Sequence, residues 1–188
     1  MFGMVALIAL VLDSVVQIDV PRRPPIPLNE TPHVVVKTYE ITGDLARDLH
    51  IEMDLKGPMT SRGERVPART EWRNQVRWMN DGTGCVPSSA ELTWQIETTL
   101  PALAADAEAG PRMRERWNAY LLQIEAFEYG RAIRINQGME AMLAAMRAAS
   151  DCDGLTAARR AGEQAIVDAN ARYDAETLRA RRAIRPLR

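Results

Sequence analysis

The chain has 188 residues and a formal net charge of −1, from 24 basic and 25 acidic side chains. This length is typical of one globular domain, and a hydrophobic content of 46% is too high for a wholly disordered protein. The balanced charge provides no general attraction to nucleic acids or to anionic membranes, so we expect no nucleic-acid partner.

Residues 1–12 form an uninterrupted apolar run that ends before Asp13. A membrane-spanning helix needs about 20 residues, so this run is too short to cross a bilayer. It resembles the hydrophobic part of an export signal, although no basic residue precedes it and no small-x-small cleavage site follows. A buried strand or helix is the alternative. We predict that residues 1–19 are an export signal or an apolar N-terminal segment, through which any membrane contact is made.

Residues 20–32 contain five prolines, which disfavour a helix or a central strand. We therefore predict a proline-rich linker here, followed by a single domain over residues 33–188. The β-branched residues and alternating patterns of the next segments predict three strands, and Asp44 is a candidate cap for a short helix. The predicted strands are 33–41, 70–78 and 91–100, and the predicted short helix is 44–53.

The second half of the chain is predicted to be helical. Apolar residues recur at helical spacing from Pro111 to about Ser150, and again from Leu155 to about Arg182. Gly130 or Gly138 is a candidate kink in the first of these helices. The predicted fold class is therefore α+β, with a small antiparallel or mixed sheet followed by two long helices.

The two cysteines, Cys85 and Cys152, lie far apart in the chain and have no metal-binding spacing. From the residues alone, a disulfide in an oxidising compartment and two unrelated buried thiols remain equally open.

One segment of the first long helix has part of the pattern of a metallopeptidase helix. Such a helix carries two His residues four positions apart, and the Glu after the first His acts as a general base on the metal-bound water. Here Glu128 has that place, but the ligand positions hold Phe127 and Arg131. Phe has no lone pair to donate, and Arg is a permanent cation. We therefore expect no metal and no cofactor.

The order of several short motifs resembles a known bacterial family, the predicted secreted zinc-dependent proteases called domain of unknown function nine-two-two. The resemblance covers residues 34–182. The matching pieces are Tyr39-Glu40-Ile41-Thr42-Gly43, Leu55-Lys56-Gly57-Pro58, Thr70-x-Trp72-x-x-x-Val76-x-Trp78, Cys85, Thr99-Leu100-Pro101, Trp117, Tyr120, Cys152 and Tyr173-Asp174-Ala175-x-Thr177.

The resemblance implies a zincin-like fold, a Cys85–Cys152 disulfide and a periplasmic or secreted location. In that family the active helix reads His-Glu-x-Gly-His, and a third His follows the Tyr-Asp-x-x-Thr motif. The implied metal-ligand positions are Phe127, Arg131 and Arg179, and the implied general base is Glu128. All three ligand positions are changed in this chain, so the resemblance implies the fold while the residues contradict the metal chemistry.

We hypothesise that Arg131 and Arg179 fill the former metal pocket and pair with Glu128, with Phe127 and Tyr173 beside them. Two guanidinium groups and one carboxylate leave a spare positive charge that would attract an anion. The alternative is that these residues are ordinary exposed charges on a helix.

The sequence therefore predicts a non-catalytic relative of zinc metalloproteases that binds a peptide, a small anion or a partner in the cell envelope. One alternative is an active metallopeptidase with non-His ligands, for which Glu125 and Glu140 are nearby acids. Another is a structural or assembly protein of the envelope. The chain has no Ser-His-Asp arrangement, phosphate loop or dinucleotide motif, and the sequence does not predict an oligomeric state.

Overall fold

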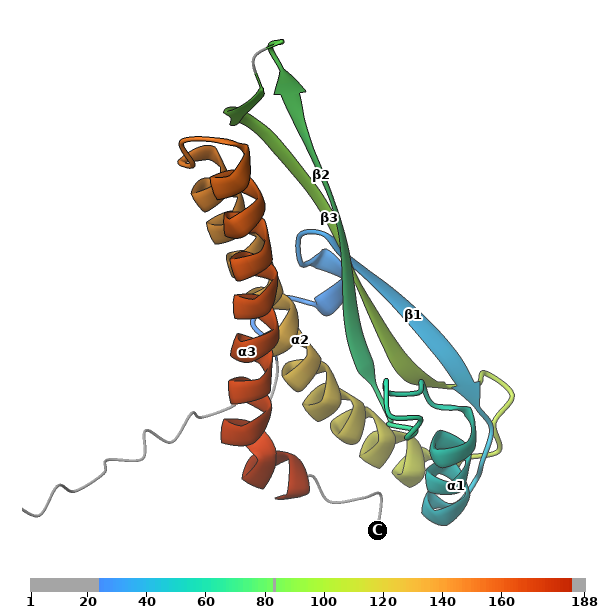
Figure 1. Cartoon of the computed structure of the whole chain (residues 1–188). Coiled ribbons are helices and arrows are strands. Elements are labelled where there is room, and N and C mark those ends of the chain that lie inside the picture. Colours follow the sequence, from blue (N-terminus) through green and yellow to red (C-terminus); the bar gives the residue numbers. More distant parts are fainter. Residues whose placement is uncertain (1–23, 83, 184–188) are drawn as a thin grey trace, which may run out of the picture.

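The computed structural model of the chain describes residues 24–82 and 84–183 (Figure 1). A three-stranded sheet is followed by two long helices, which confirms the predicted α+β class. In chain order the elements are η1 (Leu28–Glu30), β1 (Val34–Ile41), α1 (Ala46–Lys56), β2 (Arg69–Asn80), β3 (Cys85–Leu103), α2 (Pro111–Arg147) and α3 (Cys152–Ala183).

The sheet is mixed, with strand order β1-β3-β2. Strand β1 runs parallel to β3, whereas β2 runs antiparallel to it. Because β3 lies between the other two strands, β1 and β2 are both edge strands. In this register Thr70 of β2 lies opposite Thr98 of β3. Because paired residues point to the same face of a sheet, the two hydroxyl groups lie side by side.

Helix α2 packs against one face of the sheet, and α3 packs beside α2 (Figure 1). The alternating residues Leu92 and Ile96 of β3 are buried toward the helices, as the period-two pattern predicts. The stripe Met139, Met142 and Met146 of α2 is fully buried in the same core. These methionines therefore pack the domain interior.

Two glycines of α2 lie where α3 approaches closely. A Cβ atom on Gly130 would lie 2.2 Å from the hydroxyl oxygen of Tyr173, and one on Gly138 would lie 2.3 Å from a side-chain carbon of Ile166. Helix α2 is continuous through both positions. The two glycines therefore allow close contact between the long helices.

Part of the predicted proline-rich linker contacts the helices and the sheet. Leu28 is buried in the hydrophobic core, and Asn136 of α2 donates a hydrogen bond to the carbonyl oxygen of Pro32. A short 3-10 helix, η1, forms between Pro27 and Thr31. One apolar side chain and one amide therefore tie this segment to the domain, despite its prolines.

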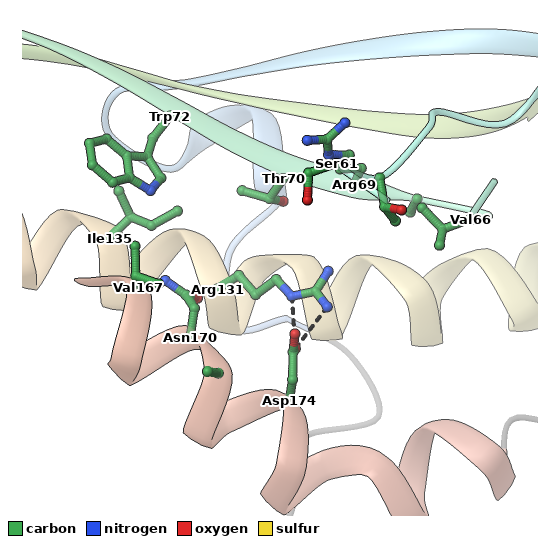
Figure 2. A pocket seen from close by; sticks show the side chains of 13 residues that line it. Ser61, Val66, Arg69, Thr70, Trp72, Arg131, Ile135, Val167, Asn170 and Asp174 are labelled. Carbon is green, nitrogen blue, oxygen red and sulfur yellow. Dashed lines mark hydrogen bonds and ion pairs between the residues drawn. The ribbon is translucent and has the colours of Figure 1, made fainter. Parts of the chain in front are cut away.

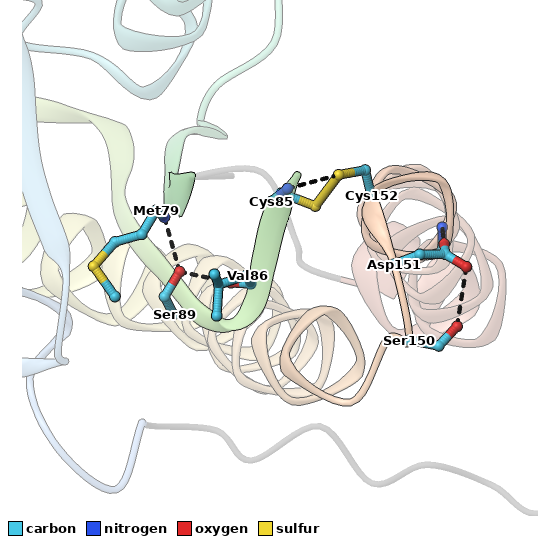
Figure 3. The surroundings of a disulfide bond; sticks show 8 residues. Met79, Cys85, Val86, Ser89, Ser150, Asp151 and Cys152 are labelled. Atoms are coloured by element: carbon cyan, nitrogen blue, oxygen red, sulfur yellow. Dashed lines mark hydrogen bonds between the residues drawn. A yellow bond between two sulfur atoms is a disulfide. The ribbon is translucent and has the colours of Figure 1, made fainter. Parts of the chain in front are cut away.

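The hairpin of β2 and β3 extends past the ends of the long helices (Figure 1). For this reason Trp78, which follows the inward-facing pattern of β2, is 40% exposed. Near the hairpin end, Cys85 forms a disulfide with Cys152 at the start of α3 (Figure 3). This disulfide, which the family resemblance implies, links the hairpin to the turn between α2 and α3.

Helix α3 begins at Cys152, three residues before the predicted start. The carboxylate of Asp151 accepts a hydrogen bond of 2.7 Å from the backbone N–H of Gly154, and this bond satisfies a donor of the first helical turn. The same bond is the main reason that the pKa of Asp151 is lowered.

Within residues 24–82 and 84–183, no helix is both long and apolar enough to span a membrane. The predicted export signal or apolar segment of residues 1–19 lies outside the described residues.

Candidate functional site

The acidic residue of the motif, Glu128, lies in the interior of the domain. Its exposed fraction is 2%, although a buried carboxylate is costly without hydrogen bonds or a counter-charge. Phe127, next to it on α2, is also buried. The partners of Glu128 therefore determine what this site can do.

A pair of threonines holds one side of the Glu128 carboxylate. The Thr70 hydroxyl donates to Oε2 at 2.7 Å, and the hydroxyl oxygens of Thr70 and Thr98 are 2.9 Å apart. Because the single hydrogen of Thr70 points to the carboxylate, Thr70 accepts the hydrogen of Thr98. Strands β2 and β3 thus supply a two-step hydrogen-bond chain to Glu128.

Arg131 provides the counter-charge. Its Nη1 donates to both carboxylate oxygens of Glu128, at 2.7 and 3.0 Å. Its Nε and Nη2 donate to Oδ1 of Asp174 on α3, at 3.0 and 2.7 Å (Figure 2). Burial lowers the pKa of Arg131, but the two carboxylates outweigh that effect and raise it above its usual value. We refer to Glu128, Arg131 and Asp174 as the ion cluster.

The prediction that Glu128 pairs with Arg131 is confirmed, but the prediction that Arg179 joins them is wrong. The side chain of Arg179 is exposed on α3, whereas the described side chains that bind Glu128 are those of Thr70 and Arg131. Asp174, five residues earlier in α3, reaches the cluster instead. The spare positive charge expected from two arginines is therefore not at this site.

Tyr173 lies beside the ion cluster and is 4% exposed. The guanidinium carbon of Arg134 lies 3.8 Å from the centre of its ring, in a cation–π contact. Burial is the main reason that the pKa of Tyr173 is raised. Its hydroxyl faces Gly130, so the tyrosine packs between the two long helices.

A pocket of about 450 Å³ opens next to the ion cluster, between β2 and the two long helices (Figure 2). Arg131 and Asp174 form part of its wall, together with Thr70 and Trp72 of β2 and Val167 of α3. Thr60, Ser61, Val66 and Ala68, in the loop before β2, also line the pocket. Of the residues predicted for binding, Arg131 lines this pocket.

These residues do not fit the zinc ion that the family resemblance implies. Phe127 has no donor atom, and the guanidinium group of Arg131 is already bound to the carboxylate of Glu128. Glu140, an alternative ligand, is exposed and lies twelve residues from Glu128, or about 18 Å along the helix. Among the described residues, no group of three or more His, Cys, Asp or Glu side chains could hold a metal ion.

Sequence reasoning did not predict the roles of three residues at the site. Thr70 and Thr98 belong to the predicted strands, but their contact with Glu128 depends on the strand register and on how α2 lies across the sheet. In the sequence, Asp174 is distinguished only by its place in the family motif. Its position three residues before Thr177 carries no sign that it binds Arg131.

The comparisons with known proteins give one result. No curated protein and no solved structure matches the chain significantly. The model of a family of bacterial proteins of unknown function, DUF922, matches residues 36–180, which include the sheet except for the first two residues of β1, the ion cluster and both cysteines. The chain therefore belongs to the DUF922 family.

Proposed function

We propose that this chain is a non-catalytic relative of zinc-dependent proteases and that it binds an extended peptide segment of another protein. The observation that supports this proposal most is the ion cluster, in which the guanidinium group of Arg131 binds the carboxylate of Glu128. A pocket remains open beside this cluster.

The surroundings of Glu128 argue against a role as a general base. A general base must reach the water molecule or the proton that it removes. Both oxygens of Glu128 accept hydrogen bonds, from Arg131 and Thr70, and the residue is 2% exposed. The carboxylate is thus held inside the protein by Arg131 and Thr70.

The position of β2 supports peptide binding. It is an edge strand, and an edge strand can pair with an added strand through backbone hydrogen bonds. The pocket lies along the same strand, because Thr70 and Trp72 of β2 line it. A peptide that pairs with β2 would therefore be able to place a side chain in the pocket. Binding of a small anion is less well supported, since Arg179 lies elsewhere and Arg131 is bound to two carboxylates.

We further propose that the protein acts in the periplasm or outside the cell. The Cys85–Cys152 disulfide is compatible with an oxidising compartment, in which such bonds persist.

The proposed function is tested with a fluorogenic peptide library and with a phage-displayed random peptide library. We expect no hydrolysis by the purified chain with added ZnCl₂, and no difference between wild type and Glu128→Gln. We also expect selected peptides to bind the wild-type chain. Zinc-dependent hydrolysis that Glu128→Gln abolishes would contradict the proposal, and so would the failure of every library peptide to bind.

A further inference from the structure

We infer that the pocket beside the ion cluster accepts an uncharged, apolar side chain of the bound peptide, aromatic or large aliphatic, and rejects carboxylates and amines. This inference rests on the proposed peptide-binding function and adds the chemistry that the pocket selects. Its volume of about 450 Å³ lies in the range of about 300–1,000 Å³ that is typical of ligand sites.

Apolar side chains from three elements form one part of the pocket wall, and polar or charged side chains form the rest. Trp72 of β2 lies across from Ile135 of α2 and Val167 of α3 (Figure 2). Val66, Ala68 and Ala171 add further apolar surface. An apolar group that enters this space leaves water and contacts carbon atoms on several sides, which is favourable in proportion to the area buried.

The charged groups that line the pocket are bound to other groups of the protein. Arg131 donates to Glu128 and Asp174, as described above. Arg69 lies 2.6 Å from a carboxylate oxygen of Glu71 and also donates to the carbonyl oxygen of Met59. A carboxylate in the pocket would have to compete with these acceptors and would face the carboxylate of Asp174. An ammonium group would face two guanidinium groups, and the carboxylate of Asp174, which would attract it, is already bound to Arg131.

The polar groups that β2 and α3 contribute to the wall offer little to a ligand, and the hydroxyl groups of Thr60 and Ser61 line the pocket from the loop before β2. The hydroxyl hydrogen of Thr70 is donated to Glu128. The amide nitrogen of Asn170 donates to the carbonyl oxygen of Ile166, and its amide oxygen is buried, so that a ligand does not reach it. A polar ligand group placed beside Thr70 and Asn170 would therefore lose its hydrogen bonds to water without replacing them.

Val167 marks the entrance of the pocket and is 52% exposed. Leu178, on the same helix, is 44% exposed but does not line the pocket. The two residues form a matched pair for mutation, because each is an aliphatic side chain on α3 that contributes little to the core.

The test uses ¹⁹F NMR of the full chain labelled with 5-fluorotryptophan. The chain has four tryptophans, and of these Trp72 lines the pocket, while Trp78 lies at the hairpin end and Trp117 is buried in the core. The Trp72 resonance is assigned with Trp72→Phe. The probes are blocked peptides Ac-Gly-Ala-X-Ala-Gly-NH₂ with Phe, Leu, Glu or Lys at X.

We expect the Phe and Leu peptides to shift the Trp72 resonance, and the Glu and Lys peptides to bind at least about tenfold more weakly. Val167→Asp should weaken binding of the Phe peptide at least about tenfold, whereas Leu178→Asp should leave it unchanged. Val167→Ser replaces Val167→Asp if circular dichroism shows that the latter is misfolded.

The outcomes separate this inference from the function on which it rests. The apolar specificity would be overturned if the Glu or Lys peptide bound at Trp72 as tightly as the Phe peptide. It would also be overturned if Val167→Asp and Leu178→Asp changed the affinity for the Phe peptide equally. Either result would leave peptide binding intact. Library peptides that bind without shifting Trp72 would overturn the assignment of the pocket. The absence of any binding peptide would overturn the proposed function itself.

Discussion

Arg131 binds two carboxylates at the contact between the long helices. It is the counter-charge of a carboxylate that is 2% exposed, and it connects α2 to Asp174 of α3. The loss of one partner of a buried ion pair leaves an uncompensated charge in a region of low dielectric constant, and this costs more free energy than the intact pair contributes.

We predict that Arg131→Met destabilises the protein by about 3–5 kcal/mol, because Glu128 then lacks its counter-charge. The free energy of unfolding is measured by urea denaturation followed by circular dichroism. The matched control is Arg159→Met, which removes a 40% exposed arginine from its i,i+4 pair with Glu163 and should cost less than about 1 kcal/mol.

A second variant identifies the cause. If the unpaired charge of Glu128 is responsible, Glu128→Gln combined with Arg131→Met should be more stable than Arg131→Met alone. An Arg131→Met variant as stable as the Arg159→Met control would show that Glu128 does not depend on Arg131.

At the level of single residues, sequence reasoning could predict local pairs but not distant ones. Glu128 and Arg131 are three positions apart on one helix, so their contact follows from helical geometry. The choice between Asp174 and Arg179 depends on the rotation of α3 against α2, which no local pattern contains. The contact of Thr70 with Glu128 depends in the same way on the placement of the sheet.

The contact between α2 and α3 depends on small residues at the crossing points. Tyr173 is 4% exposed, and its hydroxyl lies where a side chain on Gly130 would begin. Glycine is here because a rigid ring on the facing helix fills the space.

We predict that Gly130→Ala destabilises the protein by about 1–3 kcal/mol, because its methyl group would overlap the Tyr173 ring. Alanine has a higher helix propensity than glycine, by up to about 1 kcal/mol, so the sign of the effect is informative. Thermal and urea denaturation measure it. Gly110→Ala, at a site with no atom within 4 Å, should cost no more than about 1 kcal/mol, because Gly110 is the N-cap of α2 and alanine is a poorer N-cap than glycine. A Gly130→Ala variant that is more stable than wild type would contradict the close packing.

The order and type of the elements could be predicted, but some of their ends could not. Strand β3 begins at Cys85 rather than near Glu91. Its pairing with β2 continues past an irregularity, because Arg77 pairs with Glu91 whereas Met79 pairs with Val86. The hydroxyl of Ser89 stabilises this irregular part, since it accepts from the backbone N–H of Met79 and donates to the carbonyl oxygen of Val86 (Figure 3). Pro87 and the two serines resemble a loop in the sequence and have no partner in the register with β2. They belong to the strand because Val86 and Glu91 on either side pair with β2.

The disulfide contributes to the stability of the whole molecule by closing a loop of 67 residues. In the chain-entropy treatment, such a crosslink contributes about 4 kcal/mol through the unfolded state. We predict that Cys85→Ser combined with Cys152→Ser lowers the free energy of unfolding by up to that amount, and that reduced wild type behaves like this double variant. An unchanged urea midpoint in the double variant would contradict the prediction.

Burial of tyrosines predicts a loss of stability at alkaline pH. Burial is the largest cause that raises the pKa of Tyr39, of Tyr173 and of Tyr120, the last to about 12, from the ordinary value of 10.0. Above about pH 10 the unfolded chain loses these protons before the folded chain does, so the free energy of unfolding falls as pH rises. The stabilising effect is fully present below pH 10.

Thermal denaturation between pH 8 and pH 11 tests this prediction. The melting temperature should fall above pH 10, and the fall should be smaller in Tyr120→Phe, which cannot ionise at this position. Identical pH profiles for wild type and Tyr120→Phe would contradict it.

The most direct test of the claim that Arg131 replaces a metal ion is the zinc content of the purified full chain, measured by mass spectrometry before and after dialysis against a chelator. We expect far less than one zinc ion per chain and a melting temperature that the chelator does not change. One zinc ion per chain that the chelator removes, and that Glu128→Gln fails to retain, would contradict the assignment of Arg131 as the counter-charge of Glu128.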